Sequence, residues 1–379
     1  MNPYQDAPSP AFVLEEQLLL NNLKLLQAVQ KQADVQIILA LKAYALWETF
    51  PLIGQYLSGA TASSLNEARL IYEEMGRKAH TYAVAYEAAD FEEIMQYSSH
   101  LTFNSVQQYK QFRAQIDTAS SSVSCGIRVN PEYSKVETEL YNPAAKGSRL
   151  GVTEVAFENG LPEGIEGLHF HTLCESDSYE LEKTLTALEE KFGRYLPQLK
   201  WLNMGGGHLM TRKDYDLPHL ISLLKDFKNR YPNLQIILEP GSAIAWQTGV
   251  LVTTVLDIVE NRDIKTAIIN VSFTAHMPDT LEMPYRPTIR GASEVQNGKF
   301  NYRIGGVSCL AGDYMSEYSF EKELQIGDRL IFDDMIHYTM VKTTFFNGVK
   351  HPDICLLRSD GTIETLRTFG YSDFKARLG

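Results

Sequence analysis

The chain has 379 residues, of which 44% are hydrophobic and 22% charged, so it is long enough to bury a large core and to form two domains. Its 47 acidic and 35 basic residues give a net charge of −12, which argues against a nucleic-acid partner and favours a cationic ligand. The four cysteines form no C-x-x-C pair, and no signal peptide or membrane-length apolar run is present, so we expect a cytoplasmic protein with reduced thiols.

Eight short apolar, β-branched runs recur along the first two-thirds of the chain. In order they are Val35–Leu41, Gly59–Ser64, His80–Tyr86, His100–Asn104, Val123–Asn130, Ile165–Thr172, Leu199–Gly205 and Leu234–Gly241. Segments with helical spacing lie between most of them: Leu65–Met75, Val106–Ile116, Ser178–Phe192 and Leu217–Tyr231. Strand and helix alternating eight times predict an α/β fold, a parallel (β/α)8 barrel of the TIM type, over residues 13–245.

The pattern changes after Gly241, where strand-like runs follow one another with few helical segments between them. These runs are Val250–Val259, Thr266–Ser272, Arg329–Phe332 and Tyr338–Phe346, and the pairs Asn297-Gly298 and Asn347-Gly348 are typical of hairpin turns. We therefore predict a second, mostly β domain over residues 246–379, to which residues 1–12 add a strand.

Unusual residues stand at the carboxyl ends of five predicted barrel strands, the edge at which such barrels carry their active sites. Lys42 follows the first run, Arg128 lies near the end of the fifth and His171 near the end of the sixth. Gly205–Gly207 end the seventh run, and Glu239 ends the eighth. The carboxyl edge of the barrel is therefore the candidate site.

Lys42 and Glu239 each follow an apolar run in which a charge is costly unless it is paired or neutralised. A buried amine has a lowered pKa and becomes a nucleophile toward an aldehyde, whereas a lysine just past the strand would simply reach solvent. A buried carboxylate needs a cationic partner, either a pyridinium nitrogen or a basic residue of the barrel.

The glycines and histidines also allow two interpretations each. Gly205–Gly207 offer three backbone N–H groups to a phosphate after the seventh strand, or they form a plain turn. His169 and His171 stand two apart and face the same way, as in a metal pair. Alternatively, His171 stacks on a cofactor ring and His169 packs in the layer below.

Together these residues supply the parts that pyridoxal phosphate requires: a nucleophilic lysine, a phosphate cradle, a stacking imidazole and a carboxylate for the ring nitrogen. A metal-dependent hydrolase would need more His and Asp ligands at other strand ends, so we predict no metal.

The motifs resemble those of the fold-type III pyridoxal-phosphate decarboxylases, the group of ornithine, arginine and diaminopimelate decarboxylases, whose barrel is like that of alanine racemase. The matching segments extend along nearly the whole chain: Ala40-Leu41-Lys42-Ala43-Tyr44, Gly167-Leu168-His169-Phe170-His171, Met204-Gly205-Gly206-Gly207 and Leu238-Glu239-Pro240-Gly241. Three more segments resemble one branch, the carboxynorspermidine (carboxyspermidine) decarboxylases: Gly147–Gly151, His171–Glu175 and Ser308–Asp313.

The resemblance implies a role for each matched residue. Lys42 would hold pyridoxal phosphate as a Schiff base, His171 would stack on its ring, Gly205, Gly206 and Gly207 would bind its phosphate, and Glu239 its ring nitrogen. Arg128 would lie at the far edge of the cofactor, and Tyr338 would approach the phosphate. Cys309 would enter the site of a neighbouring subunit, which implies a homodimer with shared sites.

The implied reaction is loss of CO2 from carboxynorspermidine or carboxyspermidine, giving norspermidine or spermidine, with Lys42 or Cys309 as proton donor. Glu175, Asp279, Glu282 and Asp313 are the candidate carboxylates for the distal amine. This chain has Leu310 where the larger family places an aspartate, and Leu173-Cys174 where it has Gly-Ser. These departures speak against ornithine and diaminopimelate as substrates. The alternative function is that of a diaminopimelate or other basic amino-acid decarboxylase, or of a racemase, on the same scaffold.

Overall fold

The computed structural model describes residues 3–119, 122–137, 139–283 and 285–379. The chain divides into two compact units: Asn22–Ile244 forms one, and Met1–Asn21 together with Ala245–Gly379 forms the other. Within the described ranges, every helix is too short or too polar to cross a membrane.

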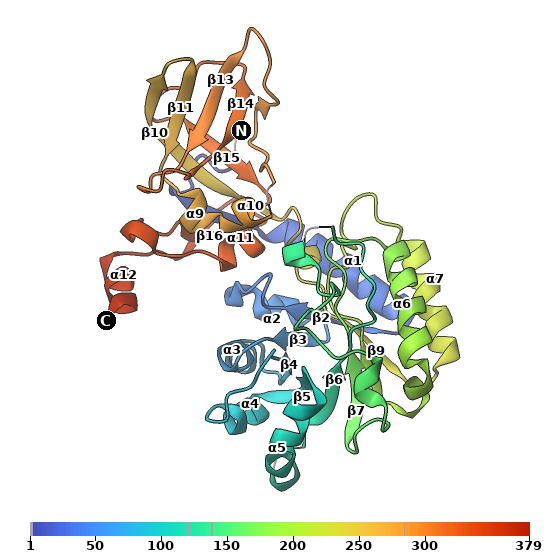
Figure 1. Cartoon of the computed structure of the whole chain (residues 1–379). Helices are drawn as coiled ribbons and strands as arrows, with labels where there is room; N and C mark the ends of the chain where they lie inside the picture. The colour runs from blue at the N-terminus through green and yellow to red at the C-terminus, as the bar shows by residue number, and fades with distance from the viewer. Residues whose placement is uncertain (1–2, 120–121, 138, 284) are drawn as a thin grey trace. The chain divides into compact units, whose positions relative to one another are not determined.

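The first unit is a closed barrel of eight parallel strands, as the alternation of strands and helices predicts (Figure 1). Its strands are β2 (Gln36–Ala40), β3 (Gly59–Ala62), β4 (Ala79–Tyr82), β5 (Ser98–Phe103), β6 (Ser124–Arg128), β7 (Ile165–His169), β8 (Trp201–Asn203) and β9 (Gln235–Leu238). The barrel closes where Gln36 and Ile37 of β2 pair with Ile237 and Leu238 of β9.

Helices follow the strands of the barrel. They are α1 (Glu16–Ala33), which begins in the other unit, α2 (Phe50–Ile53), α3 (Leu65–Met75), α4 (Phe91–Tyr97), α5 (Val106–Thr118), α6 (Ser178–Phe192), α7 (Leu217–Arg230) and α8 (Ser242–Ala245). Ser64, Ser105, Asp177 and Asp216 cap four of them, because each side chain accepts a hydrogen bond from a backbone N–H of the first turn. These caps fix where each helix starts after its strand.

Trp201, the first residue of β8, fills the interior of the barrel together with Ile38 and Ile237. The ring needs glycine on two neighbouring strands, since a Cβ on Gly126 or Gly167 would lie 2.2 or 2.0 Å from its atoms. Because side chains fill the interior of the barrel, reactive groups are expected at the carboxyl ends of the strands.

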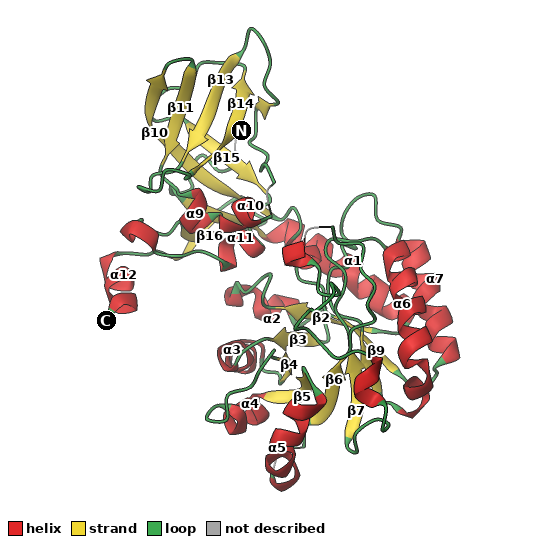
Figure 2. Cartoon of the chain, viewed as in Figure 1, coloured by secondary structure: helices red, strands yellow, loops and turns green. Residues whose placement is uncertain are grey.

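The second unit is built on one nine-stranded sheet, shown in yellow in Figure 2. Its strands are β1 (Ala11–Glu15), β10 (Gly249–Asn261), β11 (Ile264–Ile269), β12 (Ala292–Ser293), β13 (Phe300–Gly305), β14 (Tyr314–Phe320), β15 (Arg329–Asp333), β16 (Asp353–Leu357) and β17 (Ile363–Arg367). β1 lies between antiparallel β10 and parallel β16, so a strand from the N-terminal segment joins this sheet and ends at Glu15. The predicted fold class, a parallel barrel with a β-rich second domain, is confirmed.

One predicted strand is wrong. Tyr338–Phe346 contains the short helix α11 (Tyr338–Val341) and the start of a 3₁₀ turn, η5 (Phe346–Gly348). The segment does not extend because Thr339 is buried and donates its hydroxyl to Asp279, and because Met340 and Lys342 bond back to the preceding turn. Tertiary contacts thus override the β-branched composition of the segment.

The two Asn-Gly pairs do not form hairpins either. Asn297-Gly298 precedes β13, but β12 on its other side pairs with β14. Asn347-Gly348 forms part of η5, and both residues have positive φ angles, 56° and 69°. The remaining helices of this unit are α9 (Phe273–His276), α10 (Pro278–Glu282) and α12 (Tyr371–Leu378).

Candidate active site

His171 lies at the centre of the residues that gather at the carboxyl edge of the barrel. Its Nε2 is 3.0 Å from Nζ of Lys42, which follows β2. Its Nδ1 accepts the backbone N–H of Gly206 at 2.8 Å. Its carbonyl oxygen accepts a hydrogen bond from the Arg128 guanidinium at 3.1 Å. Groups at the ends of β2, β6 and β8 therefore gather around His171, which itself follows β7.

Glu239 is a buried carboxylate held between two polar side chains. Its Oε2 accepts a hydrogen bond from Asn203 at 2.9 Å, and its Oε1 lies 3.3 Å from Nε2 of His169. Burial alone would raise the pKa of Glu239, but His169, Lys42 and Asn203 together lower it to about 2. Glu239 is therefore ionised at neutral pH and can serve a cationic partner.

The three glycines are required because backbone segments approach them closely. A Cβ on Gly205, Gly206 or Gly207 would lie 2.3, 2.6 or 2.2 Å from a carbonyl oxygen of the β7 or β9 loop. The N–H of Gly205 donates to Asn203 and that of Gly206 to His171, while that of Gly207 has no partner within the described part of the chain. Gly207 is thus the glycine with a donor left for a ligand.

Solvent reaches the Lys42 side chain at the strand ends, yet protein atoms surround its amine. This burial is the main cause that lowers the pKa of Lys42, and the positive charge of Arg128 lowers it further. Glu239 opposes the shift. The amine is thereby shifted toward the nucleophilic form.

Sequence reasoning missed the residues that connect this site. Asn104, which follows β5, accepts hydrogen bonds from the Tyr82 hydroxyl (2.8 Å) and from the Gly151 N–H (2.7 Å), and donates to the Arg149 carbonyl (2.8 Å). The Tyr82 ring in turn lies 4.8 Å from the Arg128 guanidinium carbon. Like Asn203, these residues stand at strand ends, and that position was the signal that could have identified them.

The two histidines of the predicted pair have different surroundings. His169, the last residue of β7, packs its ring edge-on against Tyr82 at 5.3 Å and faces Glu239, while His171 lies beyond the strand. Across the described ranges, no three His, Cys, Asp or Glu side chains are grouped so that they could hold a metal ion.

Five of the predicted site residues belong to the β-rich unit. Asp279 and Asp313 are buried. Oδ2 of Asp279 accepts the Tyr285 and Thr339 hydroxyls at 2.7 and 2.8 Å, while its Oδ1 has no hydrogen-bond partner among the described residues, and Asp313 accepts two backbone N–H groups at 3.1 and 3.0 Å. Glu282 forms an ion pair with Lys342. Tyr338 begins α11 and is half-buried.

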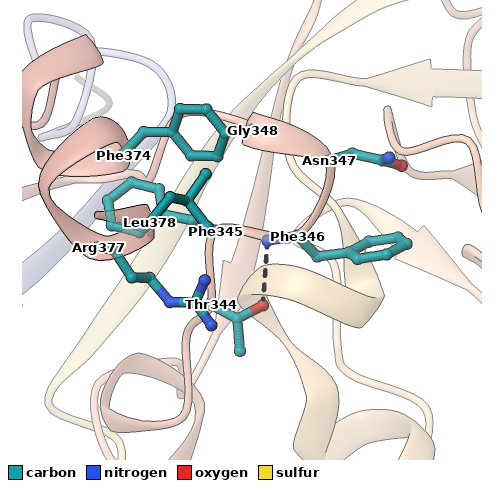
Figure 3. Close-up of a pocket in the computed structure, with 8 residues that line it drawn as sticks. All are labelled: Thr344, Phe345, Phe346, Asn347, Gly348, Phe374, Arg377 and Leu378. Carbon is teal, nitrogen blue, oxygen red and sulfur yellow. Dashed lines mark hydrogen bonds between the residues drawn. The ribbon is translucent and has the colours of Figure 1, made fainter.

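Cys309 is the fifth predicted site residue in the β-rich unit. It is exposed, and its loop is hydrogen-bonded to the segment that follows α11. Its backbone N–H donates to Oδ1 of Asn347 at 2.8 Å. Asn347 also borders a hollow of about 450 Å3 between η5 and α12, lined by Thr344, Phe345, Phe346, Asn347, Gly348, Phe374, Arg377 and Leu378. Figure 3 shows the Asn347 side chain pointing away from Phe374.

Glu175, the remaining predicted carboxylate, belongs to the barrel unit. It is exposed and adopts a positive φ of 46°, and its carbonyl accepts a hydrogen bond from Arg212 at 3.3 Å. The loop that follows His171 is therefore sharply turned at this point.

A barrel with a lysine, an imidazole, a glycine loop and a carboxylate at its strand ends defines a pyridoxal-phosphate enzyme, and the sequence comparisons agree. The sequence model of a family described as pyridoxal-dependent decarboxylase, C-terminal sheet domain, matches residues 24–336. The chain therefore belongs to the pyridoxal-dependent decarboxylase family: it is a decarboxylase, and its cofactor is pyridoxal phosphate.

Particular relatives are similar over nearly their whole length. The carboxyaminopropylagmatine decarboxylase of Synechocystis sp. is 54% identical over 372 residues, covering 98% of this chain and 96% of the relative. The carboxynorspermidine/carboxyspermidine decarboxylase of Campylobacter jejuni is 42% identical over 385 residues, covering 99% of both. The resemblance to this branch is confirmed.

A solved structure supports the same grouping. The crystal structure of carboxynorspermidine decarboxylase from Campylobacter jejuni, complexed with norspermidine, aligns with a TM-score of 0.90 at 41% identity over 97% of this chain and 99% of that one. Diaminopimelate decarboxylase from Helicobacter pylori aligns with a TM-score of 0.79 at 19% identity, over 99% of this chain and 98% of that one, and shares the fold.

Proposed function

We propose that this enzyme decarboxylates a carboxylated polyamine and that the residues around His171 hold its cofactor. The observation that carries the proposal is the grouping of a low-pKa amine, an ionised buried carboxylate and a neutral imidazole at one edge of the barrel. These are the groups that an aldehyde, a pyridinium nitrogen and an aromatic ring each require.

The residue types at this edge of the barrel match the chemical groups of the cofactor. Lys42 offers an amine for the aldehyde, His171 a ring to stack on, and Glu239 a carboxylate for the ring nitrogen. Among Gly205–Gly207, the free N–H of Gly207 is the donor for the phosphate. Arg128 completes the set that the barrel unit supplies.

Bound pyridoxal phosphate withdraws electrons from the α-carbon of an amino acid, which makes loss of CO2 possible. The side chains of the protein supply the charges and the proton that the reaction also needs. Glu239 stays ionised and so holds a proton on the ring nitrogen. The Arg128 guanidinium lies over the Tyr82 ring and donates a hydrogen bond to the His171 backbone. Lys42 or Cys309 returns a proton to the α-carbon.

The substrate is proposed to be carboxynorspermidine or carboxyspermidine, the substrates after which the Campylobacter jejuni relative is named. Of the four predicted carboxylates, Asp279 and Asp313 accept hydrogen bonds within the β-rich unit. Glu175 is exposed, and Glu282 can exchange Lys342 for a substrate amine. All four stay candidates for the distal cation, since Oδ1 of Asp279 has no partner among the described residues.

A second candidate is carboxyaminopropylagmatine, because the relative at 54% identity is named for it. Its distal group is a guanidinium, which pairs with carboxylates in a planar, two-point geometry that an ammonium cannot match. The two substrate classes share the amino-acid end and differ only in what the distal carboxylates must bind.

We further propose a homodimer in which Cys309 serves the site of the neighbouring subunit. The exposed position of Cys309 and the Asn347 contact that fixes its loop support this assignment. Sedimentation of the wild type would give the oligomeric state. Mixing inactive Lys42→Ala with inactive Cys309→Ala subunits should restore part of the activity if sites are shared.

Two measurements test the function. Borohydride reduction should bleach the cofactor absorbance and label Lys42 in peptide maps, while Lys42→Ala abolishes the label and Lys110→Ala, an exposed α5 lysine, leaves it unchanged. CO2 release should be compared for carboxynorspermidine, carboxyspermidine, carboxyaminopropylagmatine and diaminopimelate. We expect the carboxylated polyamines to exceed diaminopimelate in kcat/KM by about tenfold or more, and the opposite order would refute the proposal.

A further inference from the structure

The two ring nitrogens of His171 have different partners, and together these partners determine where its proton is. Nδ1 lies 2.8 Å from the backbone nitrogen of Gly206, whose N–H points at it. A peptide N–H can only donate, so Nδ1 must carry a lone pair. The proton of the neutral ring is therefore on Nε2.

Nε2 lies 3.0 Å from Nζ of Lys42. An Nε2–H group needs an acceptor, and an amine accepts only when it is neutral, because an ammonium has no lone pair. A charged Lys42 donating to Nε2 would leave lone pairs on both ring nitrogens, which is an imidazolate. The short contact is therefore compatible with a neutral amine only.

We propose that the Gly206 amide fixes the Nε2–H tautomer of His171, and that this tautomer keeps Lys42 neutral before the cofactor binds. Gly206 is a positioning residue in this scheme, acting through His171. The inference rests on the proposed function, since it explains how Lys42 is prepared for an aldehyde.

The surrounding charges are consistent with this assignment. Burial and the charge of Arg128 lower the pKa of Lys42, and the same two causes hold the pKa of His171 well below its usual value, so the ring stays neutral. The groups that act on Lys42 in the opposite direction come from β9, the β7 loop and α3: Glu239, Cys174 and Glu67. The hydrogen bond from His171 thus acts against three groups that favour the ammonium.

A neutral Lys42 can react without first losing a proton. The lone pair of Nζ forms the C–N bond to the aldehyde carbon, the electrons of the carbonyl π bond move to its oxygen, and the two Nζ protons leave with that oxygen as water. An ammonium would have to lose a proton to solvent first, and the rate at neutral pH would fall with the neutral fraction.

The test uses the full-length protein freed of cofactor, with pyridoxal phosphate added back over a range of pH. The initial rate of Schiff-base formation gives the pH midpoint of the Lys42 amine. In His171→Asn, whose amide oxygen can still accept the Gly206 N–H, and in His171→Phe, which keeps the burial, we expect the midpoint to move to higher pH. For each pH unit by which the midpoint rises, the rate of Schiff-base formation at pH 7 falls about tenfold relative to its plateau at high pH.

His219→Asn is the matched control, because His219 stacks on Tyr179 at α6 and α7, away from the site, and should leave the midpoint unchanged. A midpoint that stays at the wild-type value in His171→Phe would overturn the inference. So would a 15N spectrum of the cofactor-free wild type that shows the His171 proton on Nδ1. If reduction never labels Lys42, the proposed function fails and this inference fails with it. If Lys42 is labelled but the midpoint stays unchanged in His171→Phe, only this inference fails, so the two failures are distinguishable.

Discussion

Replacing Glu239 by glutamine removes the negative charge at the end of β9 while keeping the size of the side chain. Glutamine can still accept the Asn203 hydrogen bond that Glu239 accepts at 2.9 Å. It cannot offer a charge to His169, 3.3 Å away, or to Lys42. The substitution therefore isolates the contribution of the charge.

The pKa of Glu239 is lowered from 4.5 to about 2, and this difference sets the size of the effect. It corresponds to about 3 kcal/mol of stability at neutral pH. Because the folded-state pKa lies below the unfolded one, this contribution is fully present above pH 4.5 and is lost as the pH falls toward 2. Glu239→Gln should therefore be less stable than the wild type at pH 7 by up to that amount, and the gap should close in acid.

Urea unfolding followed by tryptophan fluorescence at pH 7 and pH 3 measures both stabilities. Glu73→Gln is the control, because Glu73 forms an exposed ion pair with Arg69 at 2.7 Å. Such a pair contributes at most about 0.5 kcal/mol, so this control should stay close to the wild type. In the loaded enzyme, Glu239→Gln should also lower kcat by about a hundredfold or more, as expected when a preorganised charge is removed from an active site.

The reasoning would be refuted if Glu239→Gln and the wild type had the same unfolding free energy at pH 7 and the same acid profile. That outcome would show that His169, Lys42 and Asn203 do not stabilise the ionised carboxylate. An unchanged kcat would separately exclude Glu239 as the partner of the ring nitrogen.

Three more substitutions test other contacts. Asn104→Ala removes three hydrogen bonds, two of them to the 147–151 turn and one to Tyr82, so this turn should be cleaved faster by protease and KM should rise more than kcat falls. Gly167→Ala would place a Cβ 2.0 Å from the indole that fills the barrel, and should lower thermal stability by about 1–3 kcal/mol or more. Asn347→Ala frees the backbone N–H of Cys309 and should change the rate at which thiol reagents modify that residue; an unchanged rate would show that the contact does not fix the loop.

The barrel was predictable because its signals are local. The predicted helices Leu65–Met75 and Ser178–Phe192 coincide with α3 and α6, since Ser64 and Asp177 stand where N-caps are needed. Each of the eight predicted strands likewise overlaps an observed one. Strand and helix alternate over short distances, so composition and periodicity are sufficient there.

The β-rich unit was harder because its strands depend on distant partners. β16 pairs with β1, more than 300 residues away, and neither its sequence nor its burial alternates in the simple way of an exposed sheet. The same dependence made Tyr338–Phe346 misleading: its β-branched residues pack through Thr339 onto Asp279 instead of joining a ladder. Tertiary contacts, which cannot be read from the sequence, decide whether a segment of this composition becomes a strand.

The glycine loop shows where a residue-by-residue interpretation of the site reaches its limit. Three adjacent glycines suggest three free donors for a phosphate. In the structure each glycine is required by a carbonyl oxygen within 2.6 Å of where a Cβ would stand, and two of the three N–H groups are bound by Asn203 and His171. A glycine run therefore indicates close approach of backbone, and only hydrogen-bond partners distinguish a donor for a ligand from a donor that orients a catalytic side chain. We propose the first role for the N–H of Gly207 and the second for that of Gly206, which donates to His171.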